Sequence, residues 1–89
     1  MKTIKKGIIL VCTRDQSTGC GIRYLKKGSI VKCAAECPEW RDTVEIYRNE
    51  TEMAEHDWKP VSRNKLRQAT PEEEAMYYEG KYFLETAKV

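Results

Sequence analysis

The chain lacks any run of 18 apolar residues, so nothing in it predicts a helix that crosses a membrane. Its one N-terminal apolar stretch, 8–12, is too short for a secretion signal and is soon followed by Arg14 and Asp15. We therefore expect a buried strand there and a cytoplasmic protein. No internal repeat or low-complexity linker divides the 89 residues, which predicts a single domain over 1–89.

Catalytic motifs are also scarce. The only histidine, His56, stands between Glu55 and Asp57, and the chain has neither a GxSxG nor an HExxH motif. The glycine-containing loop 15–21 lacks the GxxxxGK[ST] pattern of a phosphate cradle. A domain this small buries only about 60% of its unfolded surface, which leaves little room for an enclosed active site. We expect a protein that is not an enzyme.

The four cysteines are Cys12, Cys20, Cys33 and Cys37. A reducing cytosol argues against a disulfide framework. Only the last pair, with three intervening residues, has the tight spacing of zinc ligands, so a four-cysteine site would need a hairpin that brings Cys12 and Cys20 together. We favour free, partly buried thiols and no cofactor, with a structural zinc ion as the alternative.

Short strands are predicted where apolar residues are β-branched or alternate with polar ones, in 7–14, 29–35, 42–48 and 58–62. The acidic stretch 49–57 is predicted as a loop. Residues 63–69 fit either a helical turn or the end of a strand.

A helix start is the strongest local signal. Thr70-Pro71-Glu72-Glu73 matches a capping box with proline at the first helical position, and Gly80 suits the residue after the last turn. We predict a helix over 71–79 and a final strand over 81–86. The elements together predict a mainly β (α+β) domain: a small antiparallel sheet or an SH3-like barrel, with one short helix near the C-terminus.

The net charge of +2 is distributed in blocks of alternating sign. The net charge is +7 over 1–35, −6 over 36–57, +4 over 58–70 and −3 over 71–89. These blocks either pair across the fold or form a two-signed surface that steers docking on a partner.

Aromatic residues suggest a protein-binding surface, because Trp, Tyr and Arg are enriched at binding hot spots. Trp40 follows Pro38 in a predicted loop and is the first candidate for an exposed anchor, although it would equally suit a plug at one end of a barrel. The candidate protein-binding residues are Trp40, Arg41, Tyr47, Trp58, Lys59 and Arg63.

Nucleic-acid binding is the alternative function. Basic side chains are interleaved with aromatic ones in 23–27 and 58–67. The basic side chains could neutralise phosphates, and the rings could stack on unpaired nucleobases. The opposing interpretation packs the rings in the core and leaves their basic neighbours in water. The candidate residues are Arg23, Tyr24, Lys26, Lys27, Lys59, Arg63, Lys65 and Arg67.

The segment 66–74, with its Ala-Thr-Pro-Glu-Glu helix start, resembles a pattern in small accessory proteins of tailed bacteriophages. Lys26-Lys27-Gly28-x-Ile30-Val31 is similar to the strand entry in those chains. The resemblance covers about 15 residues and carries over no functional residue. It implies a phage-encoded accessory or inhibitor that binds a host protein in the host cytoplasm, with an unspecified oligomeric state.

Overall fold

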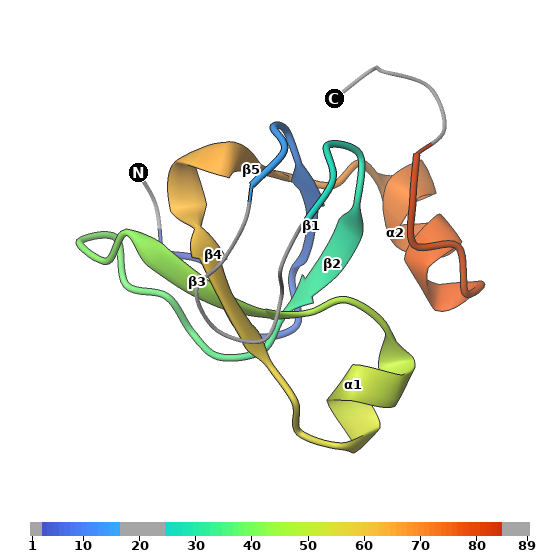
Figure 1. Ribbon diagram of the computed structural model, residues 1–89, viewed down its shortest axis with the longest axis horizontal. Coiled ribbons are helices and arrows are strands. Elements are labelled where there is room, and N and C mark those ends of the chain that lie inside the picture. The colour runs from blue at the N-terminus through green and yellow to red at the C-terminus, as the bar shows by residue number, and fades with distance from the viewer. Residues whose placement is uncertain (1–2, 17–24, 85–89) are drawn as a thin grey trace.

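A computed structural model describes residues 3–16 and 25–84 of the chain (Figure 1). Five antiparallel strands form one open sheet in the order β4-β3-β2-β1-β5. The strands are β1 (Ile9–Cys12), β2 (Ile30–Cys33), β3 (Thr43–Tyr47), β4 (Lys59–Ser62) and β5 (Leu66–Gln68). The small antiparallel sheet is confirmed. The barrel is wrong, because β4 and β5 are the two edges of the described sheet.

The outer edge of β4 is blocked, which explains why the sheet stays open on that side. Pro60 has no N–H to donate, and the N–H of Ser62 donates to Oε1 of the buried Gln16 at 3.0 Å. A short 3-10 turn, η1 (Arg63–Lys65), then leads the chain across to β5. β4 is therefore protected from pairing with another strand.

Both faces of the central strands are covered, because successive side chains of a strand point to opposite faces. On one face Leu10 and Cys12 join the larger core cluster with Val31, Val44 and Ile46. On the other face the core residues lie against the C-terminal helix, and they are Ile9, Val11, Ile30, Ala69 and Tyr77. β1 has no exposed residue, as its uninterrupted apolar run predicts.

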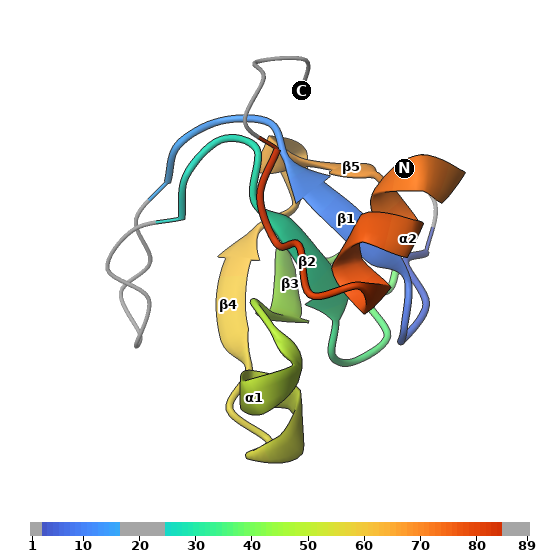
Figure 2. The same cartoon turned by 90° about the vertical axis from the view of Figure 1, so that its right-hand side faces the viewer.

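The helix α2 (Pro71–Tyr78) forms where the capping box predicts it. The N–H of Glu73 donates to Thr70 Oγ1 at 3.3 Å, and the N–H of Thr70 donates to Glu73 Oε1 at 2.8 Å. Gly80 adopts a φ of +84° just after the helix. Figure 2 shows α2 lying beside β1 and β2, where Tyr77 is fully buried.

The helix α1 (Glu50–Ala54) corrects the prediction of a loop over 49–57. The side chain of Asn49 accepts a hydrogen bond from the N–H of Glu52 at 2.9 Å, which is a standard N-cap. The Glu52 carboxylate in turn pairs with the Arg48 guanidinium. His56 ends the helix with a φ of +55°, a conformation usually taken by glycine.

The tail predicted as a strand over 81–86 forms a single antiparallel bridge, between Ser29 and Phe83, within its described part. The N–H of Leu84 donates to the carbonyl of Gly28 at 2.8 Å. Gly28 has a φ of +96°, and a Cβ atom there would lie 2.9 Å from the Leu84 carbonyl oxygen. None of the helices in the described ranges is long and apolar enough to cross a membrane.

Candidate functional site

The most exposed aromatic side chain of the described structure lies on a short turn between β2 and β3. The N–H of Arg41 donates to the carbonyl of Pro38 at 3.0 Å, which closes a turn over Pro38–Arg41. We call this segment the Trp40 turn. Trp40 is 79% exposed. The turn lies at the start of β3, at the opposite end of that strand from α1 (Figure 1).

Arg63 holds the Trp40 turn from beneath. Its side chain is 3% exposed, and Nη1 donates to the carbonyl oxygens of Pro38 at 2.6 Å and Arg41 at 3.1 Å. The thiol of Cys37 is a third contact of Nη1, at 3.4 Å. The backbone of Cys37 also pairs with Ile4 through two hydrogen bonds of 2.9 and 2.8 Å. The turn backbone is therefore fixed, while the indole lies in solvent.

The predicted protein-binding residues fall into separate groups. Trp40 and Arg41 are both exposed on the Trp40 turn. Tyr47 and Trp58 pack together at the other end of β3, with ring centroids 6.4 Å apart. Arg63 was expected at the contact surface, but its burial makes it a support of the turn.

Lys59 is also withdrawn from the surface. It is 9% exposed, and its ammonium pairs with the Asp57 carboxylate at 2.8 Å. Lys59 and the buried Val61 alternate with less buried residues along β4 and so share one face of the strand, where the aliphatic stem of a lysine packs readily along apolar surface.

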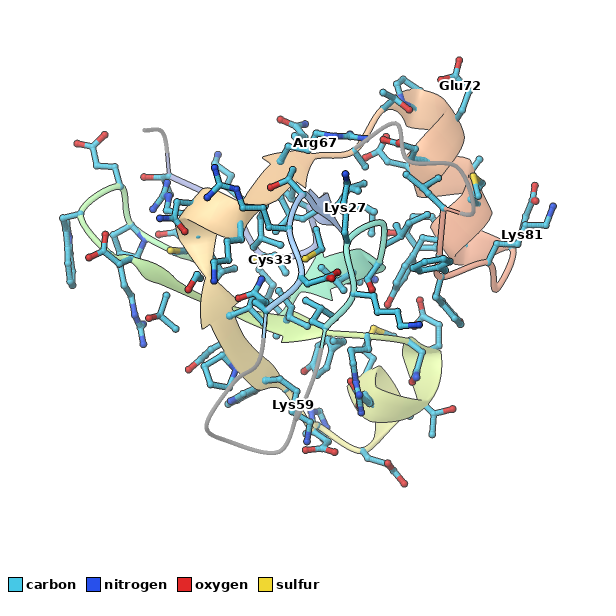
Figure 3. All side chains as sticks on the ribbon, turned by 45° about the horizontal axis from the view of Figure 1, so that its top comes forward. Lys27, Cys33, Lys59, Arg67, Glu72 and Lys81 are labelled. Atoms are coloured by element: carbon cyan, nitrogen blue, oxygen red, sulfur yellow. The ribbon has the colours of Figure 1, made fainter. Side chains whose placement is uncertain are left out.

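The basic stretch 58–67 does not form one continuous surface. Figure 3 shows Lys59 and Arg67 at opposite ends of the molecule. The Arg67 guanidinium donates to both carboxylate oxygens of Glu73 at 2.8 Å, joining β5 to α2. This pairing lowers the pKa of Glu73 to about 2 and raises that of Arg67. Lys65 is half-buried in the turn η1.

Only part of the basic stretch 23–27 lies within the described structure. Lys26 and Lys27 are exposed on the turn before β2, and the N–H of Lys27 donates to Asp15 Oδ1 at 2.7 Å. Arg23 and Tyr24 lie outside the described residues. The structure thus leaves two lysines of the predicted nucleic-acid surface in solvent on one turn.

Three of the four cysteines, Cys12, Cys33 and Cys37, are buried as free thiols in the larger core. The Cys12 thiol donates to the Arg14 carbonyl at 2.8 Å, and the Cys33 thiol donates to the Ala35 carbonyl at 3.0 Å. Burial raises the pKa of Cys33. Within 3–16 and 25–84, no three histidine, cysteine or acidic residues gather as metal ligands. Cys20 lies outside these ranges, so the four-cysteine site stays a prediction.

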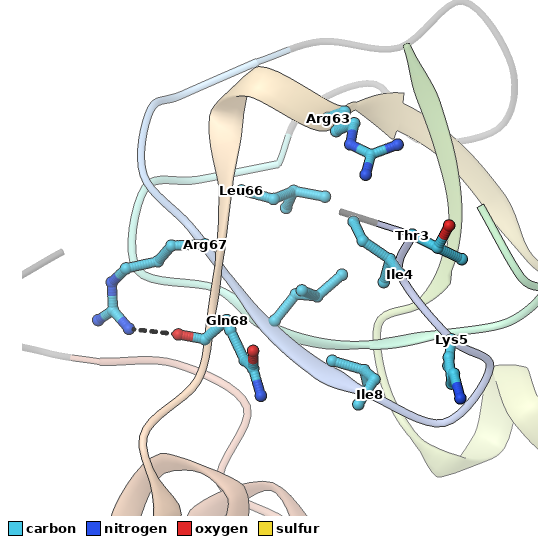
Figure 4. Close-up of a pocket in the computed structure, with 9 residues that line it drawn as sticks. Thr3, Ile4, Lys5, Ile8, Arg63, Leu66, Arg67 and Gln68 are labelled. Atoms are coloured by element: carbon cyan, nitrogen blue, oxygen red, sulfur yellow. Dashed lines mark hydrogen bonds between the residues drawn. The ribbon is translucent and has the colours of Figure 1, made fainter. Parts of the chain in front are cut away.

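A cavity of about 410 Å³ lies between residues 3–8, β1, Arg63 and β5. We call it the N-terminal pocket. Figure 4 shows Ile4, Ile8 and Leu66 around this space. Its charged lining residues are Lys5, Arg63 and Arg67, and no acidic residue lines it. Arg63 contributes to this pocket and also supports the Trp40 turn, so one buried side chain links the two features.

Sequence reasoning did not identify the apolar lining of the N-terminal pocket. Ile4, Ile8 and Leu66 come from distant parts of the chain, and no spacing pattern links them. They meet because β5 pairs with β1 on the side where residues 3–8 enter the sheet. The pairing of β1 with β5, which are more than 50 residues apart in the sequence, is therefore what creates the pocket.

No family model, curated protein or solved structure matches this chain. The resemblance of 66–74 to phage accessory proteins therefore stays a prediction. The functional argument below rests on the Trp40 turn and the N-terminal pocket.

Proposed function

We propose that this chain is a non-enzymatic binding domain that inserts Trp40 into a protein partner. The observation that carries the proposal is an indole 79% exposed on a turn whose backbone is fixed by Arg63. A tryptophan buries roughly 150–250 Å² when covered, which is worth about 4–6 kcal/mol before the costs of association. Because the turn is already ordered, binding would not have to restrict its backbone further.

The surroundings of Trp40 carry charges of both signs, because Glu39 and Asp42 are exposed on either side of Trp40 and Arg41. Arg41 is exposed beside Trp40, and its guanidinium lies 3.9 Å from the Glu45 carboxylate. The N-terminal pocket adds apolar lining and the exposed Lys5, whereas Arg67 in the same lining is already paired with Glu73. An apolar partner surface that carries charges of both signs at its rim would complement this combination.

The resemblance to phage accessory proteins suggests where such a partner would be found. Several of those proteins bind and redirect or block a host protein. We therefore propose a host protein as the partner and the host cytoplasm as the location. The chain would act as an accessory or an inhibitor of that protein.

Nucleic-acid binding through 58–67 has less support from the geometry. Lys59 pairs with Asp57, Arg63 is buried, and Arg67 pairs with Glu73. Each engaged cation would have to give up an internal contact before it neutralised a phosphate. This alternative is an outcome of the experiment below.

The experiment is an affinity capture from bacterial lysate with tagged wild-type chain and with Trp40→Ala, each with and without nuclease, followed by mass spectrometry. Tyr78→Ala is the matched control, because Tyr78 is 60% exposed but lies on α2. We expect one host protein in near-stoichiometric amount with wild type and the control, and its loss with Trp40→Ala. The variant should keep its unfolding free energy within about 0.5 kcal/mol, since the indole is exposed.

Two results would contradict the proposal. Equal capture by wild type and Trp40→Ala would remove Trp40 from the interface. A recovered set that disappears on nuclease treatment would favour nucleic-acid binding instead.

A further inference from the structure

A second cavity, of about 510 Å³, lies at the end of β3 opposite the Trp40 turn. We call it the aromatic pocket. It is lined by the turn before β1, the ends of β2 and β3, and α1 with the segment that follows it. The lining side chains that matter for the argument are Lys6, Lys32, Tyr47, Met53, His56 and Trp58.

The rings of Tyr47 and Trp58 form one wall of the aromatic pocket. They are inclined at 52° to one another, with centroids 6.4 Å apart. Tyr47 is 6% exposed and Trp58 is 45% exposed, so the tyrosine supports an indole that is half open to solvent. A half-covered indole in a concave site offers a stacking surface for a planar ring, and each such stack is worth about 1–3 kcal/mol.

Cations complete the pocket, and no acidic residue lines it. Lys32 is directly opposite Tyr47 in the β2–β3 register and is half-buried. Its Nζ lies 3.6 Å from Met53 Sδ and 5.2 Å from the centroid of the Tyr78 ring. Within the described ranges, neither Lys32 nor Lys6 has a carboxylate within 4.0 Å of its ammonium.

Two of the three acidic side chains that flank Met53 and His56 are already paired, and the third, Glu55, is exposed and does not line the pocket. The carboxylate of Glu52 is bound to Arg48, and that of Asp57 is bound to Lys59. A half-buried ammonium that contacts only a thioether and a ring face gains from an anion that approaches it. The chemistry of the lining therefore calls for a ligand with a planar ring and a negative charge.

We propose that the aromatic pocket binds a nucleotide, with the base stacked on Trp58 and the phosphate between Lys6 and Lys32. The cavity volume lies within the range of about 300–1,000 Å³ that is typical of small-molecule sites. His56 adds an imidazole ring to the lining. The site is separate from the Trp40 turn, so it stands or falls independently of the proposed protein-binding function.

The test uses the two tryptophans of the ¹⁵N-labelled wild-type chain as reporter and internal control. Trp58→Phe assigns the two indole N–H signals in the NMR spectrum. We expect adenosine monophosphate to shift the Trp58 signal saturably and to leave the Trp40 signal in place. Adenosine alone and inorganic phosphate alone should each bind at least about tenfold more weakly, since each keeps only one of the two interactions.

Variants that each remove one positive charge distinguish binding of the phosphate in the aromatic pocket from general electrostatic attraction of the phosphate to the protein. Lys32→Gln should weaken adenosine monophosphate binding by about tenfold or more, and the exposed Lys6→Gln provides a second variant if Lys32→Gln does not fold. Lys26→Gln removes the same charge at the other end of β2 and should change affinity less than about twofold.

The proposal is overturned if the Trp58 signal does not move at about 10 mM adenosine monophosphate, or if Lys26→Gln weakens binding as much as Lys32→Gln. A ten-residue single-stranded DNA distinguishes the sources of the nucleotide. Binding no tighter than that of adenosine monophosphate indicates a free nucleotide, and binding more than about tenfold tighter indicates a nucleotide within a strand.

Discussion

Replacing Arg63 by methionine should loosen the Trp40 turn and destabilise the whole domain. Methionine keeps most of the aliphatic length of the buried side chain and removes the guanidinium. The carbonyl oxygens of Pro38 and Arg41 would lose donors that now lie at 2.6 and 3.1 Å. Both acceptors belong to the turn that carries Trp40, so the local and the global effects have one cause.

The magnitude follows from these two contacts. A hydrogen bond from a charged donor contributes about 1.5–3 kcal/mol, and two such bonds would be lost, although the Pro38 carbonyl keeps the N–H of Arg41 as a donor. Removing a buried cation offsets part of this loss, because its own desolvation cost disappears. We expect Arg63→Met to lower the unfolding free energy by about 2–4 kcal/mol, a large share of the roughly 5–13 kcal/mol of a domain this size. Arg63→Lys should lose about half as much, since one ammonium cannot replace the planar donor group.

Urea unfolding followed by circular dichroism measures the global effect, and amide hydrogen exchange at Arg41 measures the local one. That amide donates to the Pro38 carbonyl at 3.0 Å and should exchange faster in Arg63→Met than in wild type. Arg41→Ala is the control and should change stability by less than about 0.5 kcal/mol, because its ion pair is exposed. Wild-type stability and wild-type exchange in Arg63→Met would refute the reasoning.

Three further predictions concern the helices. Arg67 lowers the pKa of Glu73 to about 2 from an ordinary 4.5, so the unfolded state binds this proton at a higher pH than the folded state does. The unfolding free energy of the wild-type chain should therefore fall by about 1–2 kcal/mol from this group as the pH is lowered from 5 to 2, and Glu73→Gln should not show this part of the loss. Tyr77→Phe should leave stability unchanged or raise it by about 1 kcal/mol in thermal unfolding, since the buried Tyr77 hydroxyl has no hydrogen-bond partner among the described residues; a loss above that size would contradict this. His56→Gly should stabilise the domain by about 0.5–1 kcal/mol in urea by relieving the φ of +55°, and a loss would show that the ring packs structurally.

Much of the fold follows from local signals in the sequence. The apolar run 7–14 predicts β1, the alternation over 42–48 predicts β3, and the capping box at Thr70 predicts α2. These signals work because each reflects the immediate chemistry of a strand face or a helix end. The helix α1 was missed although Asn49 and Glu52 have cap spacing, because its five residues are too few to show a helical period.

The open sheet could not be read from local pattern. Whether β4 pairs with β5 depends on Pro60 and on a hydrogen bond between Ser62 and Gln16, which are 46 residues apart. The roles of the basic residues Arg63 and Arg67 could not be predicted either, because they too depend on residues far apart in the sequence. The sequence does not show that Arg63 lies under the Trp40 turn or that Arg67 faces Glu73, because both contacts depend on tertiary packing.

The candidate sites likewise include one feature that the local sequence predicts and one that depends on tertiary packing. The exposure of Trp40 agrees with its place after Pro38 in a predicted loop. The aromatic pocket was not predicted, because Lys32 and Met53 lie on separate elements that meet only when α1 forms. A sequence pattern indicates an exposed anchor more readily than a cavity built from several elements.

The most direct test of the central claim is the affinity of the captured partner for wild-type chain, Trp40→Phe and Trp40→Ala, measured by titration calorimetry. If Trp40 is the anchor, Trp40→Ala should weaken binding by about 100-fold, and Trp40→Phe should lie between the two, as truncating a hot-spot tryptophan costs about 2–4 kcal/mol. An affinity for Trp40→Ala within about threefold of wild type would contradict the claim that this turn is the binding site.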